Sequence, residues 1–143
     1  MIIEIITTEL DFYIMEKIRE LRIKAGLDQV DVAQKIGVSE GYIGNIENPK
    51  HSAKVNIRML ARIANAIGVE SYNAFLPDKI FKTDMVRLKI KLLDISSRSQ
   101  TIREDGTVPE RLNVLSKKSL TDDDLETLKL RKGGLKYCTI IEK

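Results

Sequence analysis

QVDVAQKIGVSEGYIGNIE, residues 29–47, predicts two short helices joined by a tight turn. Gly37 stands between them, and glycine readily adopts the positive φ that such a turn requires. We expect the second helix to span 39–47, with Ser39 as its N-cap and Pro49 ending it. Helical spacing places three apolar residues on one buried face of this helix: Val38, Ile43 and Ile46. The remaining face is polar, which is typical of a helix that is presented to a groove.

The sequence on either side predicts further helices around this pair. We expect a first helix from Asp11 to Ala25, a fourth helix over 56–67 and a one-turn fifth helix over 71–75. The β-branched residues at 2–6 could form a short strand. The fold class is therefore predicted to be mainly α.

The segment from Asp11 to Pro77 resembles a Cro/cI-type helix-turn-helix domain, the DNA-binding class of phage repressors. Gln29 opens the first helix of the motif, and five residues fall at that family's spacing: Ala33, Gly37, Val38, Ile43 and Glu47. The stretches EKIRELRIKAGL and LARIANAIGV match its flanking helices. The resemblance covers about half of the chain and implies a five-helix domain over residues 11–77. It also implies an ion pair between Arg22 and Glu47, which would brace the first helix against the end of the recognition helix.

Beyond Pro77 the pattern changes, and we expect residues 78–143 to form a small mixed α/β appendage. Residues 86–92, VRLKIKL, alternate strictly and predict a half-exposed strand, although their residue types also suit a helix. The polar tract 96–109 predicts a loop or hairpin connection.

Two more elements are expected towards the C-terminus. Thr121 and Asp124 have the spacing of a capping box and open a predicted helix that ends near Leu130. A final strand is expected over 137–141. Residues 1–10 then remain as an N-terminal extension to the helical domain.

Composition bears on whether the protein is secreted, membrane-bound or cytoplasmic. The single cysteine, Cys138, cannot form an internal disulfide, which suits a reducing cytosol. No apolar run is long enough to span a membrane, and Glu4 interrupts the apolar start, which argues against a signal peptide. A cytoplasmic protein without membrane contact is therefore expected.

The net charge of +3 is unevenly distributed. Residues 1–76 carry 9 Lys and Arg against 10 Asp and Glu, whereas residues 77–143 carry 15 against 11. The helical domain is therefore not globally basic. Because phosphate neutralisation supplies much of the affinity for DNA, any DNA contact must depend on local placement of charge.

The resemblance assigns DNA contacts position by position. The expected base-reading residues are Gln29, Ser39, Glu40, Gly41 and Asn45. The expected contacts to the DNA backbone are Tyr42, Lys50, His51, Ser52 and Lys54. Amide side chains suit bidentate contact with adenine, and a carboxylate can accept from cytosine N4.

Several of these residues also have simpler interpretations. Gln29 could cap a helix, Glu40 and Asn45 could be solvated, and Tyr42 could pack against the core. The basic alternation Arg87, Lys89 and Lys91 suits either an exposed strand face or a nonspecific DNA contact. Asp122–Asp124 is best explained by the helix dipole, and the lone His51 lacks partners at metal-ligand spacing, so no metal or other cofactor is expected.

The sequence thus predicts a DNA-binding transcriptional regulator, most simply a homodimeric repressor of a palindromic operator with the appendage as dimerisation region. The alternative is an antitoxin-like protein that regulates its own operon and binds a partner protein through its C-terminal half. An enzyme is the weakest interpretation, because the chain has no phosphate loop, no nucleophile with a base and no zinc spacing.

Overall fold

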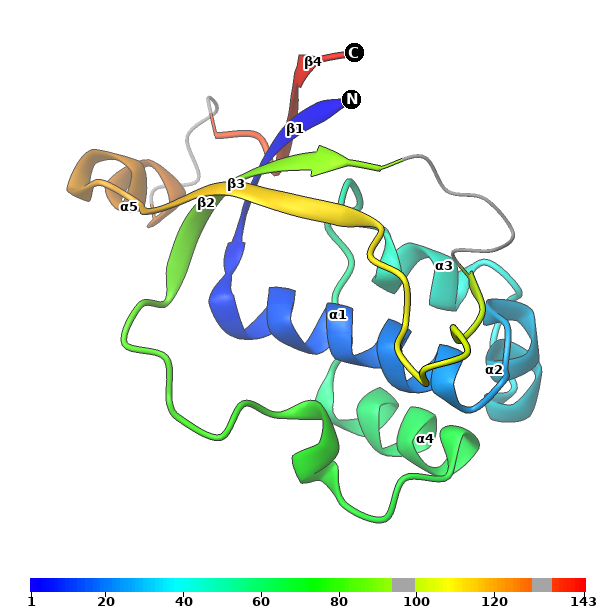
Figure 1. Ribbon diagram of the computed structural model, residues 1–143. Helices are drawn as coiled ribbons and strands as arrows, with labels where there is room; N and C mark the ends of the chain where they lie inside the picture. The colour runs from blue at the N-terminus through cyan, green and yellow to red at the C-terminus, as the bar shows by residue number, and fades with distance from the viewer. Residues whose placement is uncertain (94–99, 130–134) are drawn as a thin grey trace.

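The computed structural model describes residues 1–93, 100–129 and 135–143. Figure 1 shows a group of short helices below a twisted sheet, with helix α1 (Glu9–Lys24) lying between the two. The other elements, in chain order, are β1 (Ile2–Thr8), α2 (Gln29–Ile36), α3 (Tyr42–Glu47), α4 (Ile57–Ile67), the 3-10 helix η1 (Tyr72–Phe75), β2 (Met85–Leu92), β3 (Leu112–Ser119), α5 (Asp122–Lys129) and β4 (Cys138–Glu142).

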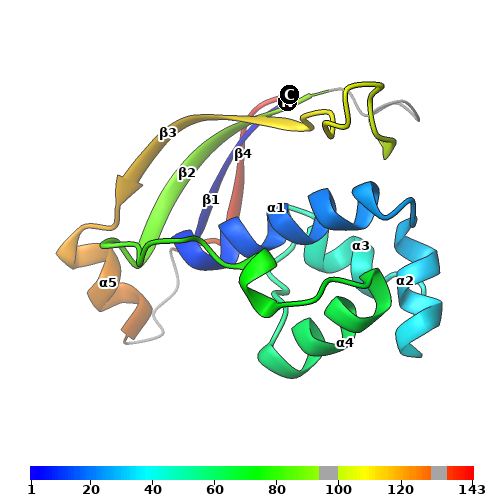
Figure 2. The same ribbon diagram turned by 60° about the horizontal axis from the view of Figure 1, so that its bottom comes forward.

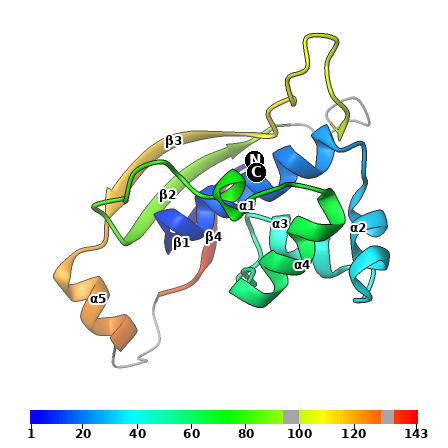
Figure 3. The same cartoon turned by 90° about the horizontal axis from the view of Figure 1, so that it is seen from below.

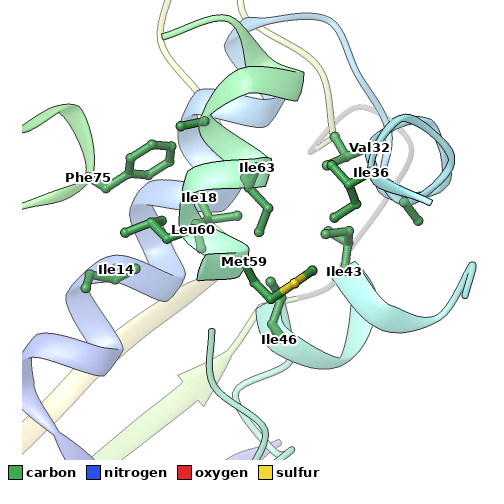
Figure 4. Packing of buried hydrophobic residues seen from close by; sticks show 12 residues of the cluster. Ile14, Ile18, Val32, Ile36, Ile43, Ile46, Met59, Leu60, Ile63 and Phe75 are labelled. Carbon is green, nitrogen blue, oxygen red and sulfur yellow. The ribbon is translucent and has the colours of Figure 1, made fainter. Parts of the chain in front are cut away.

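Helices α1 to α4 and η1 share one apolar core, which Figure 4 shows from close by. Its buried members are Ile14, Ile18, Val32, Ala33, Ile36, Ile43, Ile46, Met59, Leu60, Ile63, Ala64 and Phe75. Side chains cap the N-termini of most of these helices, because the first N–H groups of a helix have no hydrogen-bond partners within it. Thr8 caps α1 by accepting from the Asp11 N–H, and Asn56 caps α4 by accepting from the Met59 N–H. The expected fifth helix is this single 3-10 turn.

The sheet is antiparallel throughout, in the order β3-β2-β1-β4. Figure 2 shows it arching over α1. Ile3, Ile5, Val86, Leu88 and Ile90 are buried on its inner face, and the Phe12 side chain of α1 packs against them. Leu92, Leu112, Tyr137 and Cys138, the first residue of β4, extend this second core.

Residues 85–92 are a strand and not a helix, because period-two alternation lets this segment bury one row of side chains on the inner face of the sheet while its backbone pairs with β1 and β3. The basic residues Arg87, Lys89 and Lys91 accordingly lie on the outer face. Arg87 is not available there as a free charge, since it pairs with Glu4 at 2.8 Å and with Asp124 at 3.2 Å.

The mainly α fold class is too narrow. Residues 2–6, for which the sequence permits a short strand in an N-terminal extension, belong to β1, which pairs with both β2 and β4 and leads directly into α1. The sheet therefore draws on both ends of the chain, and the fold combines a helical unit with a four-stranded sheet.

The C-terminal helix α5 lies at the opposite end of the molecule from α2 (Figure 3). Its expected capping box is present, since the Asp124 N–H donates to Thr121 Oγ1 at 3.1 Å and the Thr121 N–H donates to Asp124 Oδ2 at 3.3 Å. Among the described residues, no helix combines the length and apolar character needed to cross a membrane.

Candidate nucleic-acid interface

The turn between α2 and α3 has the geometry that the sequence predicts. Gly37 ends α2 in the left-handed conformation, with φ 73° and ψ 35°, and its N–H reaches the carbonyls of Ala33 and Gln34. Ala33 is fully buried at this crossing. Asp28 caps α2 by accepting from the Asp31 N–H, and the Asp31 side chain accepts in return from the Asp28 N–H. Local chemistry therefore fixes both ends of α2.

Helix α3 is shorter than the sequence predicts. It begins at Tyr42 instead of Ser39. Gly41 occupies the N-cap position and has no side chain to accept a capping hydrogen bond. Ser39 is not the N-cap; its carbonyl accepts from the Tyr42 N–H at 3.0 Å, which closes a preliminary turn. Glycines at 41 and 44 disfavour helix by about 1 kcal/mol each relative to alanine, which explains the late start.

A buried ion pair joins α1 to the end of α3. Arg22 donates from Nε to Glu47 Oε2 at 2.7 Å and from Nη2 to Glu47 Oε1 at 2.8 Å. A third bond from Arg22 reaches the Leu27 carbonyl at 2.9 Å. The two side chains are 2% and 1% exposed, so this is the expected brace in bidentate and desolvated form.

Gln29 is attached to the same brace. Its Nε2 donates to Glu47 Oε1 at 3.3 Å, and its side chain is half-buried between α2 and α3. Gln29 does not cap α2, because Asp28 does so. Gly44 leaves room for it: a Cβ at position 44 would lie 3.1 Å from Gln29 Oε1.

The other four base-reading candidates are exposed and close together in sequence. Ser39, Glu40, Gly41 and Asn45 occupy the turn before α3 and its first turns. The buried residues of α3, Ile43, Ile46 and Glu47, point the other way into the core and the brace. The structure thus presents one polar side of α3 and anchors the opposite side.

The backbone-contact candidates divide into two groups. Lys50, His51 and Ser52 are exposed in the loop after α3, and His51 Nδ1 accepts from the Ala53 N–H at 3.0 Å. Tyr42 packs partly against the helical core, and burial raises the pKa of its hydroxyl, an effect that the positive charge of Arg62 opposes.

Lys54 departs from the expected role. Its ammonium donates to the carbonyls of His51 and Ala53, at 2.9 and 3.2 Å, and to the hydroxyl of Tyr137 at 2.7 Å. It also lies 4.6 Å from the centre of the Tyr137 ring. All three of its N–H donors are therefore used within the protein, which leaves none for a phosphate.

Tyr137, immediately before β4, is a residue that the sequence gave no reason to include. Burial, followed by the charges of Cys138 and Asp11, raises the pKa of its hydroxyl to about 12. Burial also lowers the pKa of Lys54. The contact connects the loop after α3 to the sheet, across 83 positions of sequence. Only a folded chain can bring such a pair together.

Comparison with known families supplies the name for this arrangement. A family model described as helix-turn-helix matches residues 18–72. Residues 18–72 are a helix-turn-helix domain of the Cro/cI type. Such domains are the DNA-binding modules of transcriptional regulators. Neither the curated proteins nor the solved structures gave a match to the chain. The matched segment runs from the middle of α1 to the start of η1, so it lies within the helical unit and outside the sheet.

Within the described ranges, no group of three or more His, Cys, Asp or Glu side chains is arranged to hold a metal ion.

Proposed function

We propose that this protein is a sequence-specific transcriptional regulator that reads the major groove of DNA with α3. One observation carries the proposal. The polar residues at the start of α3 are exposed, while the opposite side of the helix is locked by the core and by the Arg22–Glu47 brace. A recognition helix needs this combination, because its side chains must reach base edges from a rigid support.

Each base-reading residue has a chemical role in the proposal. Asn45 offers a donor and an acceptor that suit adenine, and Glu40 can accept from the amino group of cytosine. Gln29 uses one N–H of its amide on Glu47, so the second N–H remains for a DNA acceptor. Ser39 and Gly41 allow close approach, since both are small and exposed.

Anchoring to the DNA backbone is assigned to the loop after α3. Lys50, His51 and Ser52 are its exposed polar residues, whereas Lys54 acts as an internal support for the loop. The low overall charge of residues 1–76 agrees with an anchor of few ionic contacts. The salt dependence of binding should therefore be modest, because each phosphate contact adds about 0.9 to the salt slope.

We further infer a homodimeric repressor that occupies a palindromic operator, with half-sites about 34 Å apart. A single short helix reads few base pairs and so gives limited specificity, whereas a twofold pair of domains would read two half-sites. The sheet supplies surface for such a pair: Val114 and Leu115 on the edge strand β3 are 46% and 48% exposed.

The test is selection from pooled genomic DNA fragments with sequencing, repeated across a salt titration. We expect enrichment of one palindrome that persists at moderate salt. Asn45→Ala should relax preference at one base pair of each half-site by about 1–3 kcal/mol, while Lys50→Gln should lower the salt slope by about 0.9 without changing the preferred sequence.

Asn65→Ala serves as the matched control, because Asn65 is an exposed amide on α4. It should leave both the preferred sequence and the affinity unchanged. A lack of enrichment, or equal effects of Asn45→Ala and Asn65→Ala, would contradict the proposal.

A further inference from the structure

An open pocket of about 530 Å³ lies where the helix-turn-helix domain meets the sheet. Gln29, Gly44, Glu47 and Lys50 line it from the helical side. Met1, Leu92, Leu93 and Arg111 line it from the sheet side. Its volume falls within the range of small-molecule sites, about 300–1,000 Å³. The pocket lining therefore combines residues of the helix-turn-helix domain with residues from the sheet side, which lie outside the matched segment 18–72.

Arg111 is the most unusual residue in this wall. Its side chain is 8% exposed, and its Nη2 donates to Glu16 Oε1 at 2.6 Å. Its Nε is buried and has no hydrogen-bond partner among the described residues. A buried guanidinium nitrogen without a partner is costly, and a ligand that accepts a hydrogen bond would relieve that cost.

The exposed charge in the pocket lining favours an anion. The guanidinium of Arg111 is paired with Glu16, whereas Lys50 contributes an exposed ammonium from the opposite side. Glu47 also lines the pocket, but Arg22 engages both oxygens of its carboxylate, so its charge is balanced within the brace.

The apolar part of the lining indicates the rest of the ligand. Met1, Leu92 and Leu93 form one continuous end of the sheet beside Arg111, and the Leu93 N–H donates to the Arg111 carbonyl at 2.9 Å. Gly44 contributes no side chain, which keeps the space in front of Gln29 open. An oxyanion attached to a small apolar body matches a lining of this kind.

We propose that this pocket binds a small organic oxyanion, a carboxylate or a phosphate ester with an apolar body, through Arg111 and Lys50. The ligand would lie against Gln29, a residue of the DNA-reading surface. Its negative charge near the DNA phosphates should weaken DNA binding, and DNA should weaken ligand binding by the same factor. This coupling rests on the proposed DNA-binding function, whereas the site itself does not.

Nitrogen-15 NMR on the full-length chain tests the site directly, because the Nε–H signals of arginine are resolved from the backbone. The probes are inorganic phosphate, phenyl phosphate and the neutral benzyl alcohol, each added at constant ionic strength. We expect saturable shifts of the Arg111 Nε–H and the Gln29 amide with both phosphates. Phenyl phosphate should bind about tenfold more tightly than inorganic phosphate, because its ring buries apolar surface.

Two variants and two controls separate binding from folding. Arg111→Gln removes the Nε–H signal itself, so its readout is the Gln29 amide, whose shift should disappear; this variant also breaks the pair with Glu16. Lys50→Gln keeps that pair and should weaken phenyl phosphate severalfold with an unchanged unfolding transition. Arg103→Gln and Lys79→Gln remove exposed charges outside the pocket and should have no effect.

The coupling is measured by fluorescence anisotropy with the selected operator duplex. Saturating phenyl phosphate should weaken duplex binding about fivefold in the unmodified chain and less in Lys50→Gln.

The absence of a saturable shift of Arg111 with either phosphate up to about 10 mM would overturn the inference, as would equal binding by the control and pocket variants. A shift of the Arg111 Nε–H caused by the duplex alone would also overturn it and would assign the pocket to the DNA backbone. If no duplex is bound at all, the NMR titration still decides the site.

Discussion

Replacing Glu47 with alanine should destabilise the protein far more than an ordinary surface substitution. The change leaves Arg22, 2% exposed, with a buried positive charge and only the Leu27 carbonyl as its remaining partner. Removing one member of a buried pair costs about 3–5 kcal/mol. For a chain of this length that corresponds to a fall in melting temperature of about 10 °C or more.

The control for this substitution is Glu20→Ala. Glu20 pairs with Lys17 and Lys24 on the surface of α1, with its side chain 33% exposed. Exposed pairs contribute about 0–1 kcal/mol, so its loss should be small. The double replacement Arg22→Met with Glu47→Leu should recover most of the stability lost in Glu47→Ala, because no charge then remains buried.

Urea denaturation followed by far-ultraviolet circular dichroism is the suitable assay, since the chain has no tryptophan. Midpoints at an unchanged m-value report stability alone. If Glu47→Ala lowers the free energy of unfolding no more than Glu20→Ala does, the reasoning is refuted and the pair is not a brace.

Three further expectations can be checked on the same chain. In an alkaline absorbance titration one tyrosine should ionise near pH 12, and Tyr137→Phe should remove it. Because the folded chain holds that proton more tightly than the unfolded chain, Tyr137 contributes stability that is fully present below about pH 10 and is lost as the pH rises towards about 12. Gly37→Ala should cost about 1 kcal/mol or more, measured by urea midpoint, since φ at this position is +73°. Gly44→Ala should be neutral or stabilising by less than about 1 kcal/mol, because its Cβ meets only the flexible end of Gln29; a large loss of stability there would contradict this account.

The helix-turn-helix unit could be predicted because its signals are local. Gly37 at the turn, Ala33 at the crossing and the apolar spacing of α3 each act within a few residues of the chain. The start of α3 was misplaced because Ser39 satisfies the general preference for an N-cap. Two nearby glycines weaken the helix there, and no side chain caps its first turn.

The site could be predicted only in part, for the same physical reason. Exposure of Glu40 and Asn45 follows from helical periodicity. The fate of Lys54 does not, because its partner Tyr137 is 83 positions away and provides both a hydroxyl and a ring face. Arg111 was likewise absent from the expected site, since nothing in its local sequence distinguishes a buried arginine from an exposed one.

By itself, the sequence determined the helix-turn-helix unit: its family, its turn and its buried face. Only the tertiary structure decided that β1 lies at the centre of the sheet and that the sheet borders the residues proposed to read DNA. Helical contacts are made between residues three or four apart, so their pattern is written in any short window. Strand partners and buried ion pairs join residues far apart in the chain, and their selection depends on how the whole molecule packs.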